Sequence, residues 1–124
     1  MDGAAFATDA GSWYLRGQRT QVAADAGAAA GVVWIPDPTA YSTNALEAVR
    51  RNGFPTASLV ASFAAAEADP AAPALPWVEV TLTTNSTLEV AIRTEGETFF
   101  TSPVLDSVSI TRRAEAQYIE PTPL

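Results

Sequence analysis

The chain of 124 residues is long enough for one domain that buries most of its apolar surface. It has no Cys and no His, which excludes disulfides, thiol and imidazole nucleophiles, Ser-His-Asp triads and the common zinc sites. Its seven basic residues, all Arg, stand against fourteen carboxylates, and the resulting net charge of −7 opposes binding to nucleic acid or to anionic lipid.

Residues 1–33 are predicted to form one long helix, because Ala, Gln, Arg and Leu are frequent and no proline precedes Pro36. Residues at steps of three and four share one face of such a helix. The face that a sheet would bury contains Phe6, Ala10, Trp13, Gly17, Thr20 and Ala24. Phe6 and Trp13 are its large side chains, and we expect both in the core.

A second set of apolar residues repeats at helical spacing on the opposite side of this helix: Leu15, Val22, Ala26 and Ala29. A sheet covers only one side of a helix, so this set either meets another chain or is simply exposed. Single exposed apolar residues are ordinary on protein surfaces. The four residues are therefore a predicted interface, with plain exposure as the alternative.

A short second helix is predicted within residues 44–53. Asn44 is a suitable N-cap with Glu47 at the third helical position, an arrangement close to a capping box. Two Arg residues occupy the last turn, where the helix dipole favours cations, and Asn52-Gly53 provides a left-handed stop.

Residues 56–68 fit two structures, since Leu59, Ala61 and Phe63 alternate as in a strand while residues 64–68 favour a helix. Residues 69–76, with the sequence DPAAPALP, are predicted to form a loop.

Residues 77–118 have an apolar period of two, which predicts an antiparallel sheet. Its first two strands reverse at Asn85-Ser86, residues 94–97 form a turn, and the last strand runs from Ser107 to about Tyr118. Residues 119–124 are expected to fray. The expected core side chains of this part are Val78, Val80, Leu82, Leu88, Val90, Ile92, Phe99, Val108 and Ile110.

Together these elements predict an α+β domain, in which a long N-terminal helix packs on an antiparallel sheet of three or four strands, with a short second helix between them. No segment has the eighteen or so consecutive apolar residues of a membrane span.

The residues suggest no catalytic, metal or cofactor site. Glu95 and Glu97 flank a glycine, but a calcium site needs six or more oxygen ligands. Asp37, Glu67 and Asp69 lie in separate segments, so the sequence pairs no two carboxylates for acid–base work. We expect solvated charges, no cofactor and no enzymatic activity.

One pattern in the first helix resembles a known family. An Asp, a Gly, an aromatic residue, an Arg, a Gln and an Ala-rich run follow one another as Asp9, Gly11, Tyr14, Arg16, Gln21, Ala23, Ala24, Asp25 and Ala26. This resembles the segment after the membrane anchor in TadE/TadG-like proteins, the pilin-like components of the tight-adherence (Flp, type IV-like) pilus machinery. The helix that ends in Asn52-Gly53 is similar to one in that family.

The resemblance implies a pilin-like exported domain and an edge strand within residues 56–63. It also implies a membrane helix ahead of this segment, which would anchor the full-length protein in the cytoplasmic membrane at the cell envelope or pilus. The expected function is that of a minor pilin or pilus-assembly component, whose partners are other pilin-like subunits.

Two rival functions make different demands on the fold. An exported glycan-binding or adhesion module would present Trp34, Tyr41 and Trp77 on one surface, whereas a pilin-like domain would bury at least two of them. A small hydrolase would need two carboxylates in one cleft.

Overall fold

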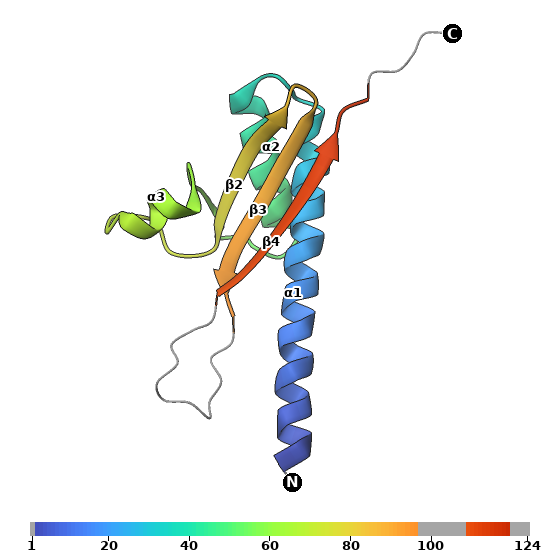
Figure 1. Ribbon diagram of the computed structural model, residues 1–124, viewed down its shortest axis with the longest axis vertical. Helices are drawn as coiled ribbons and strands as arrows, with labels where there is room; N and C mark the ends of the chain where they lie inside the picture. The colour runs from blue at the N-terminus through green and yellow to red at the C-terminus, as the bar shows by residue number, and fades with distance from the viewer. Residues whose placement is uncertain (1, 97–108, 120–124) are drawn as a thin grey trace.

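The computed structural model describes residues 2–96 and 109–119, with the backbone alone for residues 2–14. The chain forms an α+β domain with two helices on one face of a sheet and a third, short helix beside the edge of the sheet (Figure 1). The elements are α1 (Asp2–Val32), α2 (Pro38–Arg51), β1 (Ser58–Leu59), α3 (Phe63–Ala68), β2 (Trp77–Thr84), β3 (Thr87–Glu95) and β4 (Ser109–Gln117).

The sheet has four strands in the order β1-β2-β3-β4, and it is mixed. The β2–β3 and β3–β4 pairs are antiparallel, as predicted for residues 77–118. The prediction of a purely antiparallel sheet is wrong, because β1 pairs parallel to β2. The chain returns through α3 and the loop at 69–76 before β2 begins, so both strands start from the same end of the sheet.

One face of β2, β3 and β4 is apolar, and we call it the inner face. Val78 pairs with Ile92, Val80 with Val90, and Leu82 with Leu88, so the period-two pattern lines up across the hairpin. Strand β4 pairs with β3 and adds four residues to this face. Three of them are apolar, namely Ile110, Ala114 and Ala116, and the fourth is Arg112.

Helix α1 crosses the inner face and contacts α2, β3 and β4 (Figure 1). Its buried side is made of small residues, including Thr20, Ala24 and Ala28. At Gly31 an added Cβ would lie 2.6 Å from Leu88 Cδ2 and 2.9 Å from the Tyr41 carbonyl oxygen. Glycine here lets the helix lie directly against α2 and β3.

The N-terminal half of α1 extends beyond the sheet (Figure 1). A helix of 31 residues is about 46 Å long. Arg16 Nη1 donates a hydrogen bond to the Glu95 carbonyl oxygen at 3.2 Å, at the end of β3. The turns before Arg16 therefore project past the sheet.

Helix α2 begins earlier than predicted. Its N-cap is Asp37, whose Oδ1 accepts from the backbone N–H of Thr39 at 3.1 Å and of Ala40 at 3.2 Å. The prediction of Asn44 as N-cap is wrong: its amide lies inside the helix and donates to the Ala40 carbonyl oxygen. The helix begins earlier because Pro38 starts it: proline breaks a helix in its interior but is favoured in the first turn.

The other end of α2 confirms the predicted stop. The helix ends at Arg51 with Asn52 as C-cap, and Gly53 has φ +113°. A positive φ carries no steric cost at glycine, so the Asn-Gly pair turns the chain out of the helix.

The segment at 56–68 contains both of the structures that its sequence fits. Only Ser58 and Leu59 form the edge strand β1, and α3 follows with Ser62 as N-cap, whose Oγ accepts from the Ala65 N–H at 3.0 Å. Phe63 therefore begins a helix instead of ending a strand.

Strand β3 continues to Glu95, so residues 94–95 belong to a strand and not to the predicted turn. Several predictions lie outside the described residues: the side chains of Phe6 and Trp13, and the positions of Glu97, Phe99, Val108 and residues 120–124.

Candidate functional site

The first candidate surface is the side of α1 that faces away from the sheet. Leu15 is 57% exposed and Val22 is 55% exposed. Ala29 is also exposed, whereas Ala26 is half-buried. The described fold therefore leaves most of the predicted interface uncovered.

Val33 extends this line of residues and was not found from the sequence. It is exposed in the turn that follows α1, four residues after Ala29. At about 100° per residue, position 33 falls in line with position 15, so the helical spacing itself carried the signal. We call Leu15, Val22, Ala26, Ala29 and Val33 the α1 stripe.

Polar residues interrupt the α1 stripe. Gln18, Arg19 and Asp25 are exposed on the same side of the helix. A face of this mixed character does not resemble a domain core cut in half, which is the character of obligate interfaces. It suits a contact that is weak between free domains.

The predicted core residues of the sheet lie where packing requires them. Val78, Leu88, Val90 and Ile92 are fully buried, and Ile110 is nearly so. Val80 and Leu82 are half-buried. These side chains hold the sheet against α1 and α2.

The three aromatic residues of the glycan-binding alternative do not share one surface. Trp34 is exposed in the turn after α1. Tyr41 lies on α2, and its backbone carbonyl oxygen is close to Gly31 of α1. Trp77 begins β2 at the other end of the sheet, opposite Arg93, and its indole N–H donates to the Pro73 carbonyl oxygen at 2.7 Å. The arrangement offers no three-residue platform. The expectation that a pilin-like domain buries at least two of them is wrong as well, because Trp34 is exposed and Tyr41 and Trp77 are only half-buried.

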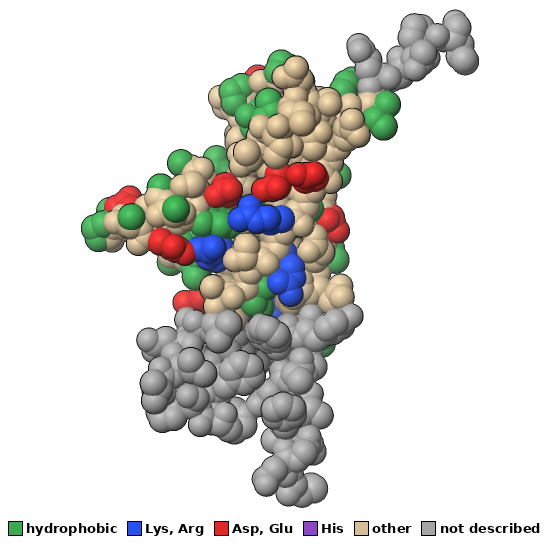
Figure 2. Space-filling model, viewed as in Figure 1, with side chains coloured by type: hydrophobic (Ala, Val, Ile, Leu, Met, Phe, Trp, Pro, Cys, Tyr) green, Lys and Arg blue, Asp and Glu red, His purple; other side chains and the backbone are tan. Residues whose placement is uncertain are grey.

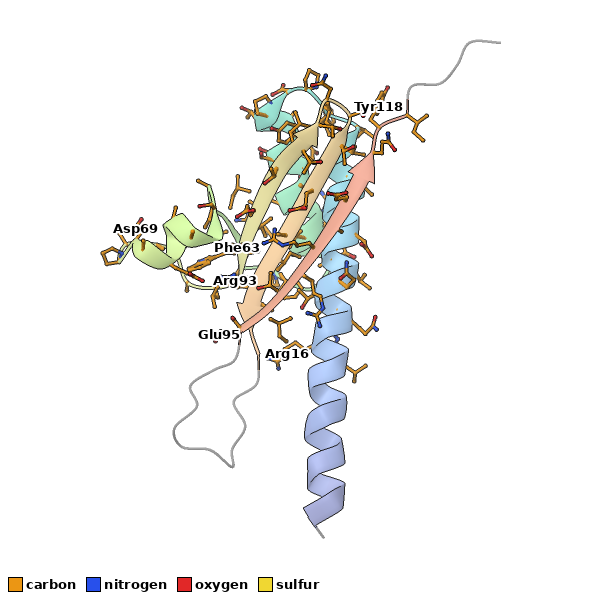
Figure 3. All side chains as sticks on the ribbon, viewed as in Figure 1. Arg16, Phe63, Asp69, Arg93, Glu95 and Tyr118 are labelled. Atoms are coloured by element: carbon orange, nitrogen blue, oxygen red, sulfur yellow. The ribbon has the colours of Figure 1, made fainter. Side chains whose placement is uncertain are left out.

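The second candidate surface is the outer face of the sheet, opposite α1. Figure 2 shows acidic and basic side chains alternating across it beside α3. The strand register puts Glu79, Ala91 and Arg113 in one row across three strands, with Arg93 and Thr111 in the adjacent row. Charged side chains from β2, β3 and β4 therefore share this face, and Figure 3 shows Arg93 close to Phe63 at the start of α3.

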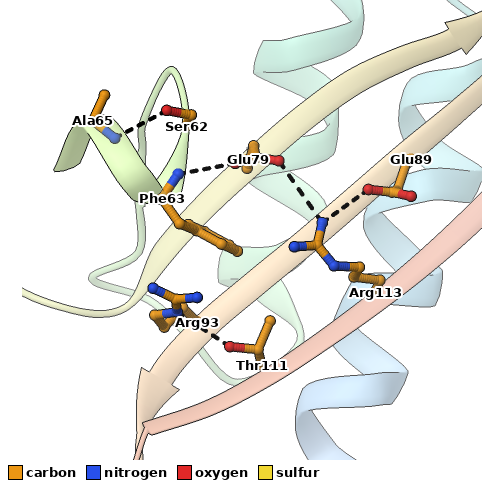
Figure 4. Close-up of polar contacts among 8 residues, drawn as sticks. All are labelled: Ser62, Phe63, Ala65, Glu79, Glu89, Arg93, Thr111 and Arg113. Atoms are coloured by element: carbon orange, nitrogen blue, oxygen red, sulfur yellow. Dashed lines mark hydrogen bonds and ion pairs between the residues drawn. The ribbon is translucent and has the colours of Figure 1, made fainter. Parts of the chain in front are cut away.

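Phe63 of α3 lies on this charged face (Figure 4). Its ring centroid is 4.5 Å from Arg93 Cζ and 5.8 Å from Arg113 Cζ, and the residue is only 4% exposed. Both guanidinium groups are within cation–π range of one ring. Arg93 also forms an ion pair with Glu67, one helical turn after Phe63.

Polar contacts fix the arginines and the start of α3 (Figure 4). The backbone N–H of Phe63 donates to Glu79 Oε2 at 2.9 Å. Arg113 Nη1 lies 3.0 Å from Glu89 Oε1 and 3.8 Å from Glu79 Oε1. Arg93 Nε donates to Thr111 Oγ1 at 3.1 Å. We call Phe63, Glu67, Glu79, Arg93 and Arg113 the outer-face cluster.

The carboxylates singled out in the sequence have structural partners. Asp37 caps α2, Glu67 pairs with Arg93, and Asp69 Oδ1 accepts from the Ala71 N–H at 2.8 Å. Among the residues that the structure describes, no three acidic side chains are grouped as a metal site. Within the same residues, no helix is long and apolar enough to cross a bilayer.

The arrangement as a whole is suited to binding other proteins. It offers one exposed helix side on which polar residues interrupt the apolar ones, and one sheet face where an aromatic ring lies within cation–π distance of two arginines. Comparisons of the chain with protein-family models, with curated proteins and with solved structures found no match.

Proposed function

We propose that this chain is the pilin-like domain of a TadE/TadG-like minor pilin or pilus-assembly component. It works through contacts with other subunits, as an exported domain held at the cell envelope. The support is the residue pattern from Asp9 to Ala26 together with the course of α1.

The observation that carries the proposal is the double character of α1. Its C-terminal half packs on β3 and β4, while its N-terminal half projects past the sheet (Figure 1). The α1 stripe lies on the side that the sheet leaves open. A helix of this kind can join the domain to neighbours without disturbing its core.

Membrane attachment would strengthen the contact that the α1 stripe, with its mixed polar and apolar residues, makes only weakly. Anchored helices are held side by side, and this raises their effective concentration. Small residues such as Ala26 and Ala29 permit close helix approach. A contact too weak to dimerise free domains then becomes sufficient.

The test uses Val22→Glu in the full-length protein in its own bacterial host. Val22 is more than half exposed, so the variant keeps its fold while a charge enters the stripe. We expect normal abundance and loss of co-purifying envelope partners. Thr43→Glu, at an exposed position of α2, is the matched control and keeps its partners.

Cross-linking gives a second measurement that does not depend on loss of function. These 124 residues contain no Cys, so Val22→Cys introduces the one thiol of this domain. A maleimide–benzophenone reagent, attached through that thiol and then irradiated so that the benzophenone inserts into a neighbouring C–H bond, is expected to join Val22→Cys, but not Thr43→Cys, to a pilin-like subunit in intact cells. Normal partners with Val22→Glu and no adduct with Val22→Cys would refute the proposal.

A further inference from the structure

Within the outer-face cluster, the strand residues bind Phe63 and Glu67 of α3 in the way that a receptor binds a peptide. The receptor side comes from three strands: Glu79 from β2, Arg93 from β3 and Arg113 from β4. Between Glu79 and Arg113 the register places Ala91, whose side chain is small. Ala91 is 1% exposed although it belongs to the charged face, so it forms the covered floor of this site.

Few contacts hold α3 in the site. They include the Phe63 ring within cation–π distance of two guanidinium groups, the Glu67–Arg93 ion pair, the bond from the Phe63 N–H to Glu79, and the burial of Phe63 and Ala66, which are 4% and 7% exposed. The strands beneath are joined to one another and to α1 through the inner face. Segments with few buried contacts open locally while the rest of a domain stays folded.

We propose that α3 is a displaceable internal ligand, and that the site beneath it binds a partner segment with an aromatic side chain followed, one helical turn later, by a carboxylate. The chemistry follows from what the site now holds. Two guanidinium groups lie within cation–π distance of one aromatic ring, and Arg93 also pairs with an acid four residues after that aromatic residue. A partner segment of the same spacing satisfies the same groups.

This surface is opposite α1, so the proposal stands independently of the α1 stripe and of the proposed pilus function. A partner could bind the outer face whether or not α1 assembles with other helices.

The test removes the internal ligand and supplies it as a separate peptide. The variant carries Phe63→Ala and Glu67→Ala, and the probe is a synthetic peptide with the sequence of residues 62–69, SFAAAEAD. Titration to millimolar peptide, followed by NMR, is expected to shift the amide signals of Ala91, Arg93 and Arg113. The wild-type chain is expected to bind at least tenfold more weakly, because α3 occupies the site.

Two controls distinguish specific binding at this site from non-specific peptide binding. A peptide with Ala in place of its phenylalanine should not bind, and adding Arg93→Ala to the double variant should weaken binding at least tenfold. Absence of shifts in a double variant whose β3 signals are otherwise native, or equal binding of the Ala peptide, would overturn the proposal.

Hydrogen exchange on the wild-type chain tests displaceability if the double variant does not fold. The Ala66 N–H bonds to the Ser62 carbonyl oxygen inside α3, whereas Val90 lies in the central strand β3. We expect the Ala66 amide to exchange at least a hundredfold faster than the Val90 amide. Equal protection of the two amides would show that α3 opens only when the whole domain unfolds, which would refute the proposal.

Discussion

The two faces of the sheet are held to their helices by different means. On the inner face, Val90 and Ile92 are fully buried under α1, and glycine at position 31 allows close approach. On the outer face, one buried ring, one ion pair and one hydrogen bond hold the six-residue helix α3. The inner face therefore fixes the fold, while the outer face carries an element that can move without unfolding it.

The magnitudes of the two kinds of contact explain this difference. Burying one Val, Leu or Ile side chain contributes about 1.5–3 kcal/mol, and the inner face buries several. An exposed ion pair contributes about 0.2–1 kcal/mol and a cation–π contact about 0.5–2 kcal/mol, and burial of the Phe63 ring adds about as much as one inner-face side chain. The attachment of α3 is thus a smaller part of the stability of the domain than the several buried side chains of the inner face.

The strongest test of the comparison is Ile92→Ala on the inner face. Ile92 is fully buried, so removing its side chain leaves a cavity between the sheet and α1. We expect the free energy of unfolding to fall by about 2–5 kcal/mol in urea denaturation. Thr81→Ala, at an exposed outer-face position of β2, is the control, and an equal loss there would contradict the assignment of the two faces.

Close packing under α1 is tested by Gly31→Ala. The added Cβ would lie 2.9 Å from the Tyr41 carbonyl oxygen, a backbone atom that cannot turn aside. We expect a net loss of about 1–2 kcal/mol, because overpacking outweighs the better helix propensity of Ala.

Gly17→Ala is the matched control for that prediction. The three atoms nearest to its Cβ would all belong to the Arg112 guanidinium, with Nη2 at 2.8 Å, and this is the far end of a flexible side chain. Thermal unfolding should show no loss of stability, or a small gain. A larger loss of stability for Gly17→Ala than for Gly31→Ala would contradict the assignment of the closest packing of α1 to Gly31.

Phe63→Ala tests the outer face. Removing the ring costs at most the free energy that holds α3, because the variant can leave α3 detached while β2, β3 and β4 remain folded. We expect a global loss of about 1–2 kcal/mol, below the 3–5 kcal/mol typical of a Phe-to-Ala change in a core. Amide exchange should rise throughout α3 and stay unchanged in β3.

Patterns repeated within one element predicted much of this fold. The period of two in residues 78–92 identified the inner face of the hairpin, and Asn52-Gly53 identified the end of α2. In α1, helical spacing separated Thr20 and Ala24 on the buried side from Leu15 and Val22 on the exposed side. Each of these signals depends on a few neighbouring residues.

Features that depend on distant segments were missed. The parallel pairing of β1 follows from the path of the chain through residues 60–76. The outer-face cluster joins Phe63 and Glu67 to arginines 26 or more residues further along the chain. An aromatic and an acid four residues apart on a short helix were the only local sign of it.

The smallest expected effect belongs to Glu67→Gln, and its dependence on salt makes it informative. Glu67 is more than half exposed, and its partner Arg93 keeps the Phe63 ring and Thr111 as other contacts. We therefore expect a loss of about 0.2–1 kcal/mol at low ionic strength.

That loss should disappear in about 1 M NaCl, where the screening length is about 3 Å. The same salt should speed amide exchange in α3 of the wild-type chain and leave β3 unchanged, since the inner face is apolar. Phe63→Ala, which removes apolar burial, should keep most of its effect in salt. If salt left α3 exchange unchanged, the ring alone would hold α3, and the ion pairs would only set its position on the sheet.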